Sequence, residues 1–284
     1  MEKRGFAIAF SWIFAIIAGM VIFLFLMNFA YKHIFLSESK TQTVLLTNLE
    51  SQLDSLSVAE FLDKEIDLNG QFEINFDCSS ISTKSSKIST EKIIFSDKKI
   101  ISNKLKLWTQ NWKYPFDTAN FYYITSKNFY LFDAPYDLYS KIPSRFNFLI
   151  PPDPVPKDAV LIFFRQPSQS ELERYKNNQI KIIKDNTIIF YPSQETGFFG
   201  DEMLIGAIFA EDYAQYNCLK DKALARLKIV SQVYKQKAET LSRVECQDKY
   251  FMIISLLSQF PINPVSIDNA DKELERNACT PLFH

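Results

Sequence analysis

The uncharged N-terminal run constrains this chain more than any other feature. From Phe6 to Tyr31 no side chain is charged and almost all are apolar. A helix rises about 1.5 Å per residue, so about 20 residues cross a hydrocarbon core of roughly 30 Å. The run is longer than that, and Trp12 and Tyr31 lie near its ends, where amphipathic rings favour the membrane interface. We therefore expect residues 6–31 to form a transmembrane helix.

The charges on either side of this run favour one orientation. Lys3, Arg4 and the amino terminus precede it, whereas Lys32 and His33 follow it. The positive-inside bias therefore predicts a cytoplasmic leader, residues 1–5, and an extracytoplasmic remainder. A cleaved secretory signal has an apolar region of about 7–15 residues and a small-residue cleavage site, and neither is found here. The sequence predicts a retained, single-pass anchor in the cell membrane. A buried core helix is the alternative, which the length of the run disfavours.

The cysteines agree with an exported domain. All four lie after the apolar run, at Cys78, Cys218, Cys246 and Cys279. An even count in an oxidising compartment predicts two disulfides, with four reduced buried thiols as the alternative. Residues 201–241 read as one long helix, which places Cys218 about 35 Å from its C-terminal end. A bond between Cys218 and Cys246 is therefore the least favourable pairing. Of the other pairings we favour 78–218 with 246–279.

An amphipathic segment follows the apolar run. Over residues 37–68, Leu46, Leu49, Leu53 and Leu56 recur at spacings of three and four, which is typical of one helix face. No Gly or Pro interrupts the chain until Asn69-Gly70, a pair that tolerates left-handed backbone geometry. We expect one nearly continuous helix of roughly 60 residues that ends there.

Residues 69–150 are expected to form a β-rich subdomain. Strand patterns occur at 71–77, 92–95, 104–108, 120–125 and 128–132, with a turn at 126–127. The region is dense in aromatic residues, which suit either a stacking surface for sugars or bases or the core of an antiparallel sheet. We favour the core. These residues are Trp108, Trp112, Tyr114, Phe116, Phe121, Tyr122 and Tyr123.

Residues 151–284 are expected to form an α/β to helical subdomain. The proline-rich residues 151–156 predict an extended connector. After it we expect a strand at 159–164, a helix at 168–177 capped by Ser168, and a hairpin of 180–183 with 187–190. Helices at 201–241, up to 260, and from near 268 complete the chain. The fold class is therefore α+β: a long N-terminal membrane and amphipathic helix, an antiparallel aromatic-rich sheet, and a helical C-terminal region.

Composition excludes several classes of chemistry. The 284 residues carry a net charge of -1, which argues against a dedicated nucleic-acid binder. The only histidines are His33, at the membrane edge, and His284, the last residue, so a nucleophile with a positioned imidazole is not predicted. The sequence has no Gly-rich phosphate loop and no Cys-x-x-Cys pair. We expect no catalytic residues, no cofactor and no metal.

Carboxylate pairs are the only feasible acid–base groups. They are Asp133 with Asp137 and Asp201 with Glu202, although Asp201 is expected to cap the helix that it begins. Asp268 and Asp271 suit part of a calcium loop, but the Gly and Glu that such a loop requires are missing, which favours helix capping.

The N-terminus resembles a known signal. Lys3, Arg4, Gly5 and Phe6, followed directly by the apolar run, are similar to the class III signal of type IV pilin-like proteins, including their archaeal relatives. In that family a membrane peptidase cuts after the Gly and the apolar helix is retained, so the resemblance implies processing between Gly5 and Phe6. The expected long helix is also similar to the pilin spine. The chain departs from the bacterial pattern at Phe10, where those pilins carry Glu, and the resemblance is limited to the N-terminal segment.

These features predict a membrane-anchored extracytoplasmic structural or interaction protein, with a pilin-like cell-envelope subunit as its particular form. Its partners would be the lipid bilayer, a prepilin-type peptidase and like membrane helices, which Gly19, Ala15 and Ala18 allow to approach closely. In such a subunit, a charge at Leu49 or Leu53 should abolish assembly. The alternative is an anchored ligand-binding or receptor-type ectodomain, whose ligand the sequence does not specify. A hydrolase that uses Asp or Glu is a distant third.

Overall fold

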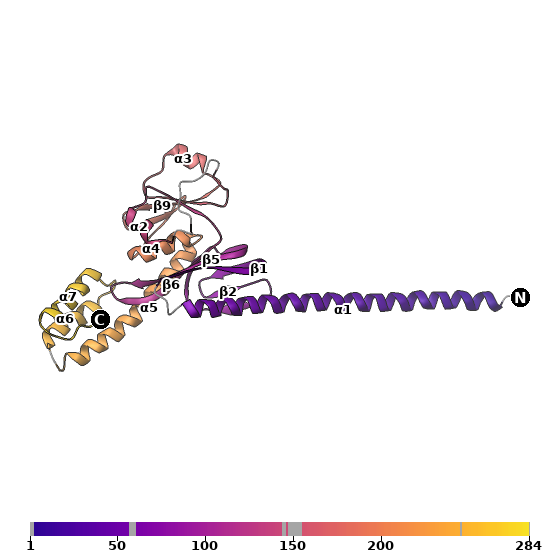
Figure 1. The fold of residues 1–284 in the computed structure, drawn as a ribbon, viewed down its shortest axis with the longest axis horizontal. Coiled ribbons are helices and arrows are strands. Elements are labelled where there is room, and N and C mark those ends of the chain that lie inside the picture. The colour runs from indigo at the N-terminus through magenta and orange to yellow at the C-terminus, as the bar shows by residue number, and fades with distance from the viewer. Residues whose placement is uncertain (1–2, 57–60, 144–145, 147–154, 245, 284) are drawn as a thin grey trace.

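The structure, a computed structural model, describes residues 3–56, 61–143, 146, 155–244 and 246–283. A long N-terminal helix projects from a folded ectodomain that contains two sheets and a group of C-terminal helices (Figure 1). The expected α+β fold class is confirmed. The C-terminal helices α6 and α7 lie at the end of the molecule opposite to the N-terminus.

Helix α1 spans Lys3–Leu56 without interruption. It is shorter than expected, because Phe61–Asp77 forms strand β1 and the prediction of a helix up to residue 68 is wrong. Asn69 does adopt left-handed geometry, with φ of 54°, but it marks a register shift within β1 and not a helix end. The backbone of this segment pairs with strand β5 on both sides of the shift, an interaction that a local helical pattern cannot reveal.

The first sheet has the strand order β3-β2-β1-β5-β6-β4. Strands β1, β5 and β6 are antiparallel neighbours, whereas the edge strand β4 is parallel to β6. The sheet is therefore mainly antiparallel, as expected, with one parallel pair. The bounds of its strands other than β1 are β2 (Ser80–Ser82), β3 (Lys87–Ser89), β4 (Ile93–Ser96), β5 (Lys99–Lys113) and β6 (Asp117–Thr125).

A second sheet, which the sequence analysis did not separate from the first, has the order β11-β10-β9-β8-β7. Residues 126–127 lead from β6 in the first sheet to β7 in the second, and β7, β8 and β9 are parallel neighbours. The proline-rich residues 151–154 lie outside the described residues, and this sheet combines strands from both sides of them. Its strands are β7 (Phe129–Phe132), β8 (Val160–Phe163), β9 (Gln179–Lys184), β10 (Thr187–Phe190) and β11 (Gln194–Gly197). The hairpin of β9 and β10 is confirmed.

The helix predicted over residues 201–241 is two helices. Ala210 is extended, and Asp212 starts a new helix by accepting a hydrogen bond from the backbone N–H of Gln215. The predicted capping of a short helix by Ser168 is confirmed. The helices are α2 (Tyr136–Lys141), α3 (Gln169–Arg174), α4 (Gly200–Phe209), α5 (Tyr213–Leu241), α6 (Gln247–Leu257) and α7 (Pro264–Arg276).

The first sheet is covered on both faces. On one face, the leucine stripe of α1 packs on alternate residues of β1, β4, β5 and β6. On the other face lies α4, whose residues 203–209 are all buried and contact side chains of both sheets. Helix and sheet approach so closely here that a Cβ atom on Gly206 would lie 2.7 Å from the ring of Phe95. Helix α4 is thus the element that the two sheets share.

The disulfides have the favoured pairing. Cys78 at the end of β1 is bonded to Cys218 on α5, and Cys246 is bonded to Cys279, with Cα–Cα distances of 6.0 and 6.2 Å. The first bond joins residues 140 positions apart and ties the first sheet to the C-terminal half of the chain. The second closes the loop that contains α6 and α7.

Candidate functional site

Helix α1 has two halves with different surroundings. Among the described residues, one segment, Ala15–His33 of α1, is long and apolar enough to cross a membrane, with a mean hydropathy of 1.9, and none of it is buried. In the second half Leu46, Leu49, Leu53 and Leu56 are all buried. The apolar run is therefore an exposed part of α1, and the same helix continues into the ectodomain core.

Polar contacts hold the second half of α1 on the first sheet. Asp54 forms an ion pair with Lys92 at 2.6 Å. The side-chain oxygen of Gln42 accepts hydrogen bonds from the backbone N–H of Ser85 at 2.9 Å and from its hydroxyl at 2.6 Å. These contacts and the leucine stripe attach the helix to the ectodomain over about four turns.

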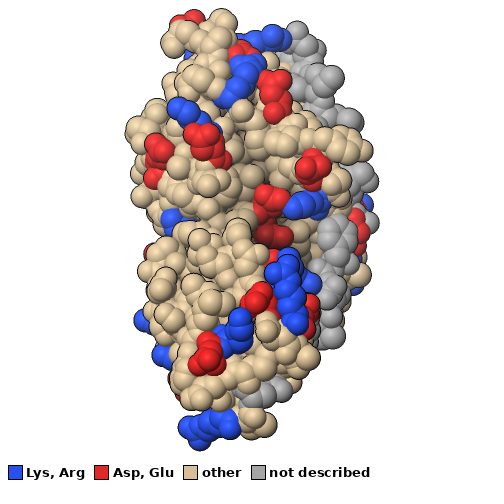
Figure 2. Space-filling model, turned by 90° about the vertical axis from the view of Figure 1, so that its left-hand side faces the viewer, with Lys and Arg blue, Asp and Glu red and all other residues tan. Residues whose placement is uncertain are grey.

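The ectodomain surface has no dominant charge on the face opposite to α1. Lys and Arg side chains are interspersed with Asp and Glu over that face, which is hollowed at about mid-height (Figure 2). This mixture agrees with the near-neutral net charge.

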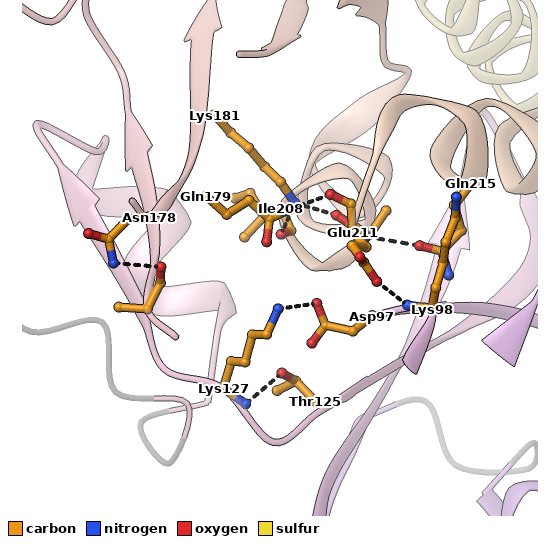
Figure 3. Close-up of polar contacts among 12 residues, drawn as sticks. Asp97, Lys98, Thr125, Lys127, Asn178, Gln179, Lys181, Ile208, Glu211 and Gln215 are labelled. Carbon is orange, nitrogen blue, oxygen red and sulfur yellow. Dashed lines mark hydrogen bonds and ion pairs between the residues drawn. The ribbon is translucent and has the colours of Figure 1, made fainter. Parts of the chain in front are cut away.

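A buried polar junction lies where the two sheets meet (Figure 3). The ammonium group of Lys181, on β9, donates hydrogen bonds to the carbonyl oxygens of Ala207 at 2.9 Å, Ile208 at 2.6 Å and Ala210. These carbonyls belong to the last turn of α4, where a helix carries partial negative charge. Lys181 is only 1% exposed, so a cation caps α4 from inside the core.

Asp97 supplies the second buried charge of the junction. It follows β4, and its carboxylate accepts a hydrogen bond from the ammonium of Lys127 at 2.7 Å. Burial raises the pKa of Asp97, and Lys127 opposes that shift. Burial likewise lowers the pKa of Lys181 to about 7, and the Asp97 carboxylate opposes it. Each buried charge therefore favours the ionised form of the other.

Backbone groups complete the junction. The Glu211 carboxylate accepts a hydrogen bond from the backbone N–H of Lys98 at 2.7 Å, and its backbone N–H donates to the side chain of Gln215 at 2.9 Å. The amide of Gln179 donates to the carbonyl of Glu211. The junction thus joins β4, β9 and the link between α4 and α5, which are distant in the sequence.

The geometry of the junction favours a structural role. A lysine with a lowered pKa is a typical nucleophile in covalent catalysis. Here the ammonium of Lys181 points at three backbone carbonyls and is enclosed by protein, which leaves no room for a substrate beside it among the described residues. We infer that the junction fixes α4 between the two sheets.

The aromatic residues of the first sheet lie in its core. Trp108, Trp112, Phe121 and Tyr123 are fully buried, as the favoured interpretation required, and the stacking-surface interpretation is wrong for them. Tyr114 is half-buried and its ring stacks on Trp112 at a centroid distance of 5.9 Å.

Two of the four candidate carboxylates, Asp133 and Asp201, are held by separate partners, and burial raises the pKa of a third, Glu202. The guanidinium of Arg165 donates to Asp133 at 2.6 Å and also binds Glu171, whereas Asp137 lies in the first turn of α2. Asp201 forms an ion pair with Lys141.

The expected caps at the candidate carboxylates are wrong. No side chain caps the start of α4, where Phe199 is the N-cap residue and Asp201 lies in the first turn. Asn263 caps α7, which begins before Asp268. Asp268 pairs with Lys272 instead, at 2.6 Å, and the buried Asp271 accepts a hydrogen bond from the backbone N–H of Leu282.

Two predicted features are only partly covered by the structure. His33 is exposed beside Phe29, and His284 lies outside the described residues. The backbone of Gly5 and Phe6 is part of α1, and cleavage between them stays a prediction. Within the described ranges, no group of three or more His, Cys, Asp or Glu side chains could hold a metal ion.

A groove of about 550 Å³ lies between the end of α1, the edge of the first sheet and α5, and we call it the α5 groove. Ala225, Arg226 and Ile229 form its α5 wall, and Ala119 and Asn120 of β6 lie in it. Sequence reasoning missed this groove and the Lys181 junction. The sequence did contain one signal for the junction, because Lys181 stands between isoleucines in a predicted strand.

No family model, curated protein or solved structure matches this chain. What can be stated of its class comes from its own structure. One apolar N-terminal helix, compatible with a membrane anchor or a signal sequence, and two disulfides in the folded part fit a single-pass membrane or secreted protein with an extracellular domain.

Proposed function

We propose that this chain is a membrane-anchored, extracytoplasmic structural subunit of the pilin-like kind, with its N-terminus in the cytoplasm. The observation that carries the proposal is the continuity of α1. Its 54 residues form one rod about 80 Å long that is exposed and apolar at one end and part of the ectodomain core at the other.

The exposed half of α1 needs a partner outside its own fold. An apolar helix surface of this size is not stable in water, and a bilayer or a bundle of like helices would cover it. Among the described residues, an added Cβ on Gly19 would meet no atom within 4 Å outside the adjacent backbone of its own helix, so this point of the helix is open to a neighbouring helix. Because the other half is fixed to the ectodomain, packing between spans would also set the spacing of the ectodomains.

We propose a non-enzymatic role for the ectodomain. Lys181 and Asp97, two charged groups whose pKa values are shifted by burial, hold the fold together, and two of the carboxylate candidates are engaged, Asp133 by Arg165 and Asp201 by Lys141. The second candidate function is an anchored binding module. It is favoured by the α5 groove and not by the buried aromatic residues.

Leader processing tests the pilin-like form of the proposal. The full chain and a Gly5→Leu variant are each expressed with a prepilin-type peptidase, and their N-terminal peptides are measured by mass spectrometry. We expect the wild-type chain to begin at Phe6 and the variant to keep residues 1–5. A wild-type chain that keeps its leader in the presence of active peptidase would contradict the pilin-like form and leave a plain signal anchor.

A further inference from the structure

The hairpin of β2 and β3 carries positive charge and no acidic residue. Residues 78–90 contain Lys84 and Lys87, many serines and threonines, and no Asp or Glu. The backbone N–H of Thr83 donates a hydrogen bond to the carbonyl of Ser86 at 2.8 Å, which closes the turn and leaves Lys84 at its tip. Both lysines are exposed, and within the described ranges neither has an ion pair or a hydrogen bond. Both charges are therefore available to an anionic partner.

The hairpin is held at a fixed height on α1. The side chain of Gln42 accepts two hydrogen bonds from Ser85 in the turn, at 2.9 and 2.6 Å. Among the α1 side chains whose burial is described, Gln42 is the first after the apolar segment to be buried. Strands β1 and β2 lie at the end of the ectodomain from which the exposed half of α1 projects (Figure 1). Within the described part of the chain, the hairpin is thus among the first parts of the ectodomain that α1 meets.

The distance from the membrane-spanning segment to the hairpin is short. Gln42 follows His33 by nine residues, which is about 14 Å along a helix. The headgroup region extends roughly 5–8 Å beyond the hydrocarbon core, so the turn lies within about 10 Å of it when α1 is upright. Charges act over about 8 Å at physiological ionic strength. Lysines at this height are therefore attracted to an anionic lipid surface.

The length of the apolar run brings the hairpin closer to the bilayer. Residues 6–31 would be about 39 Å long as a helix, whereas the hydrocarbon core is roughly 30 Å thick. A helix that is longer than the core tilts, and α1 has no break at which it could bend instead. The excess length requires a tilt without setting its direction. A tilt toward the hairpin would bring Lys84 and Lys87 to the headgroups.

We propose that the β2–β3 hairpin binds anionic headgroups of the bilayer that α1 spans, and so sets the direction in which α1 tilts. The ammonium groups of Lys84 and Lys87 pair with headgroup phosphates. The hydroxyls of Ser86 and Ser89, which have no hydrogen bond to other described residues, donate to the same phosphates. The proposal rests on the membrane anchoring proposed above. It is independent of leader processing and of which side of the membrane holds the ectodomain.

Hydrogen exchange of the full-length protein in lipid nanodiscs tests the proposal. One set of nanodiscs contains only phosphatidylcholine, and the other contains an equal mixture with anionic phosphatidylglycerol. We expect the backbone amides of residues 79–90 to exchange about threefold or more slowly in the anionic nanodiscs. The difference should disappear in 1 M salt, where the Debye length falls to about 3 Å. Peptides of α5 should exchange equally in both and show that the fold is unchanged.

Charge reversal separates binding from mere nearness to the membrane. Lys84→Glu combined with Lys87→Glu should abolish the dependence on anionic lipid, because headgroups repel the new carboxylates. The matched control combines Lys176→Glu with Lys228→Glu, which reverses two exposed charges outside the hairpin and should keep the full dependence. Soluble glycerol phosphate added to the neutral nanodiscs should leave the exchange of the hairpin unchanged.

Three results would overturn the proposal for a chain that stays in the nanodiscs. They are equal exchange of the hairpin in both lipids, equal slowing in the Lys84→Glu, Lys87→Glu variant, and slowing by soluble glycerol phosphate, which would indicate a site for free anions. A chain that does not stay in the nanodiscs would contradict the anchor as well as this proposal, so the two failures are distinguishable.

Discussion

The two halves of α1 belong to one unbroken helix, yet they differ in what covers their apolar side chains. Over Ala15–His33 nothing is buried, whereas the leucines of the second half are enclosed by the first sheet. A leucine stripe therefore does not by itself define an assembly surface. The second half has its partner within the chain, and only the first half requires one from outside.

The largest expected effect is a charge in the covered half. Leu53→Asp places a carboxylate among buried apolar residues and should destabilise the ectodomain by about 3 kcal/mol or more, measured by urea unfolding in detergent. Val44→Asp on the same helix is the control, because Val44 is 58% exposed, and it should change stability by less than about 0.5 kcal/mol. Equal effects of the two variants would contradict the difference between the faces.

This prediction revises the assembly test that the sequence suggested. A charge at Leu49 or Leu53 would unfold the ectodomain before it could report on assembly. For the same reason a soluble fragment should start before Leu46, since a later start removes part of the leucine stripe.

The opposite face of the first sheet gives the next largest effect. Gly206→Ala brings a methyl group to 2.7 Å from the ring of Phe95, so either the ring or α4 must move. We expect a loss of about 1–3 kcal/mol in the free energy of unfolding. The same measurement on Gly19→Ala should show no loss in the ectodomain, because an added Cβ there meets no atom of another described element within 4 Å.

A smaller effect is expected in the exposed half of α1, on the association between copies of the chain. Gly19→Leu adds bulk at the open point of the helix and should weaken association of the full chain in bilayers by about tenfold, measured by energy transfer between labelled copies. Ectodomain stability should be unchanged. Unaltered association would place the contact on another face of the helix.

The smallest effect on stability is expected at Glu171, which lies far from α1 and serves as a reference for the larger effects. Arg165 and the backbone of Ser168 hold the pKa of Glu171 down at about 2, below its ordinary 4.5. The stabilisation is complete above pH 4.5 and is lost as the pH falls towards 2, because the unfolded chain binds a proton first. Glu171→Gln should remove this part of the acid dependence, measured as the midpoint of urea unfolding against pH. A wild-type curve that is no steeper than that of the variant would contradict the shift.

The features that were predicted correctly from the sequence are those that depend on residues close together in the chain. The leucine stripe of α1, the Ser168 cap and the hairpin after residue 179 each depend on residues a few positions apart. The length of the helix that contains Cys218 argued against only one of the three disulfide pairings, the one with Cys246, and the favoured one of the other two is the one observed.

Features that depend on distant partners were not predictable in the same way. The end of α1 is set by pairing of residues 61–67 with β5, about 40 residues later. Lys181 is buried because the C-terminal carbonyls of α4 face it, and no pattern within β9 shows that arrangement. The second sheet was missed because β7 pairs with β8 across the proline-rich segment.

The most direct test of the anchored spine is the intact mass of the protein from alkali-washed native membranes, alkylated before reduction. The account predicts a chain that remains with the membranes, contains the whole segment from Phe6 onward, and carries no alkyl group, because all four cysteines are bonded. A chain that is released by the wash, begins after His33 or carries four alkyl groups would contradict it.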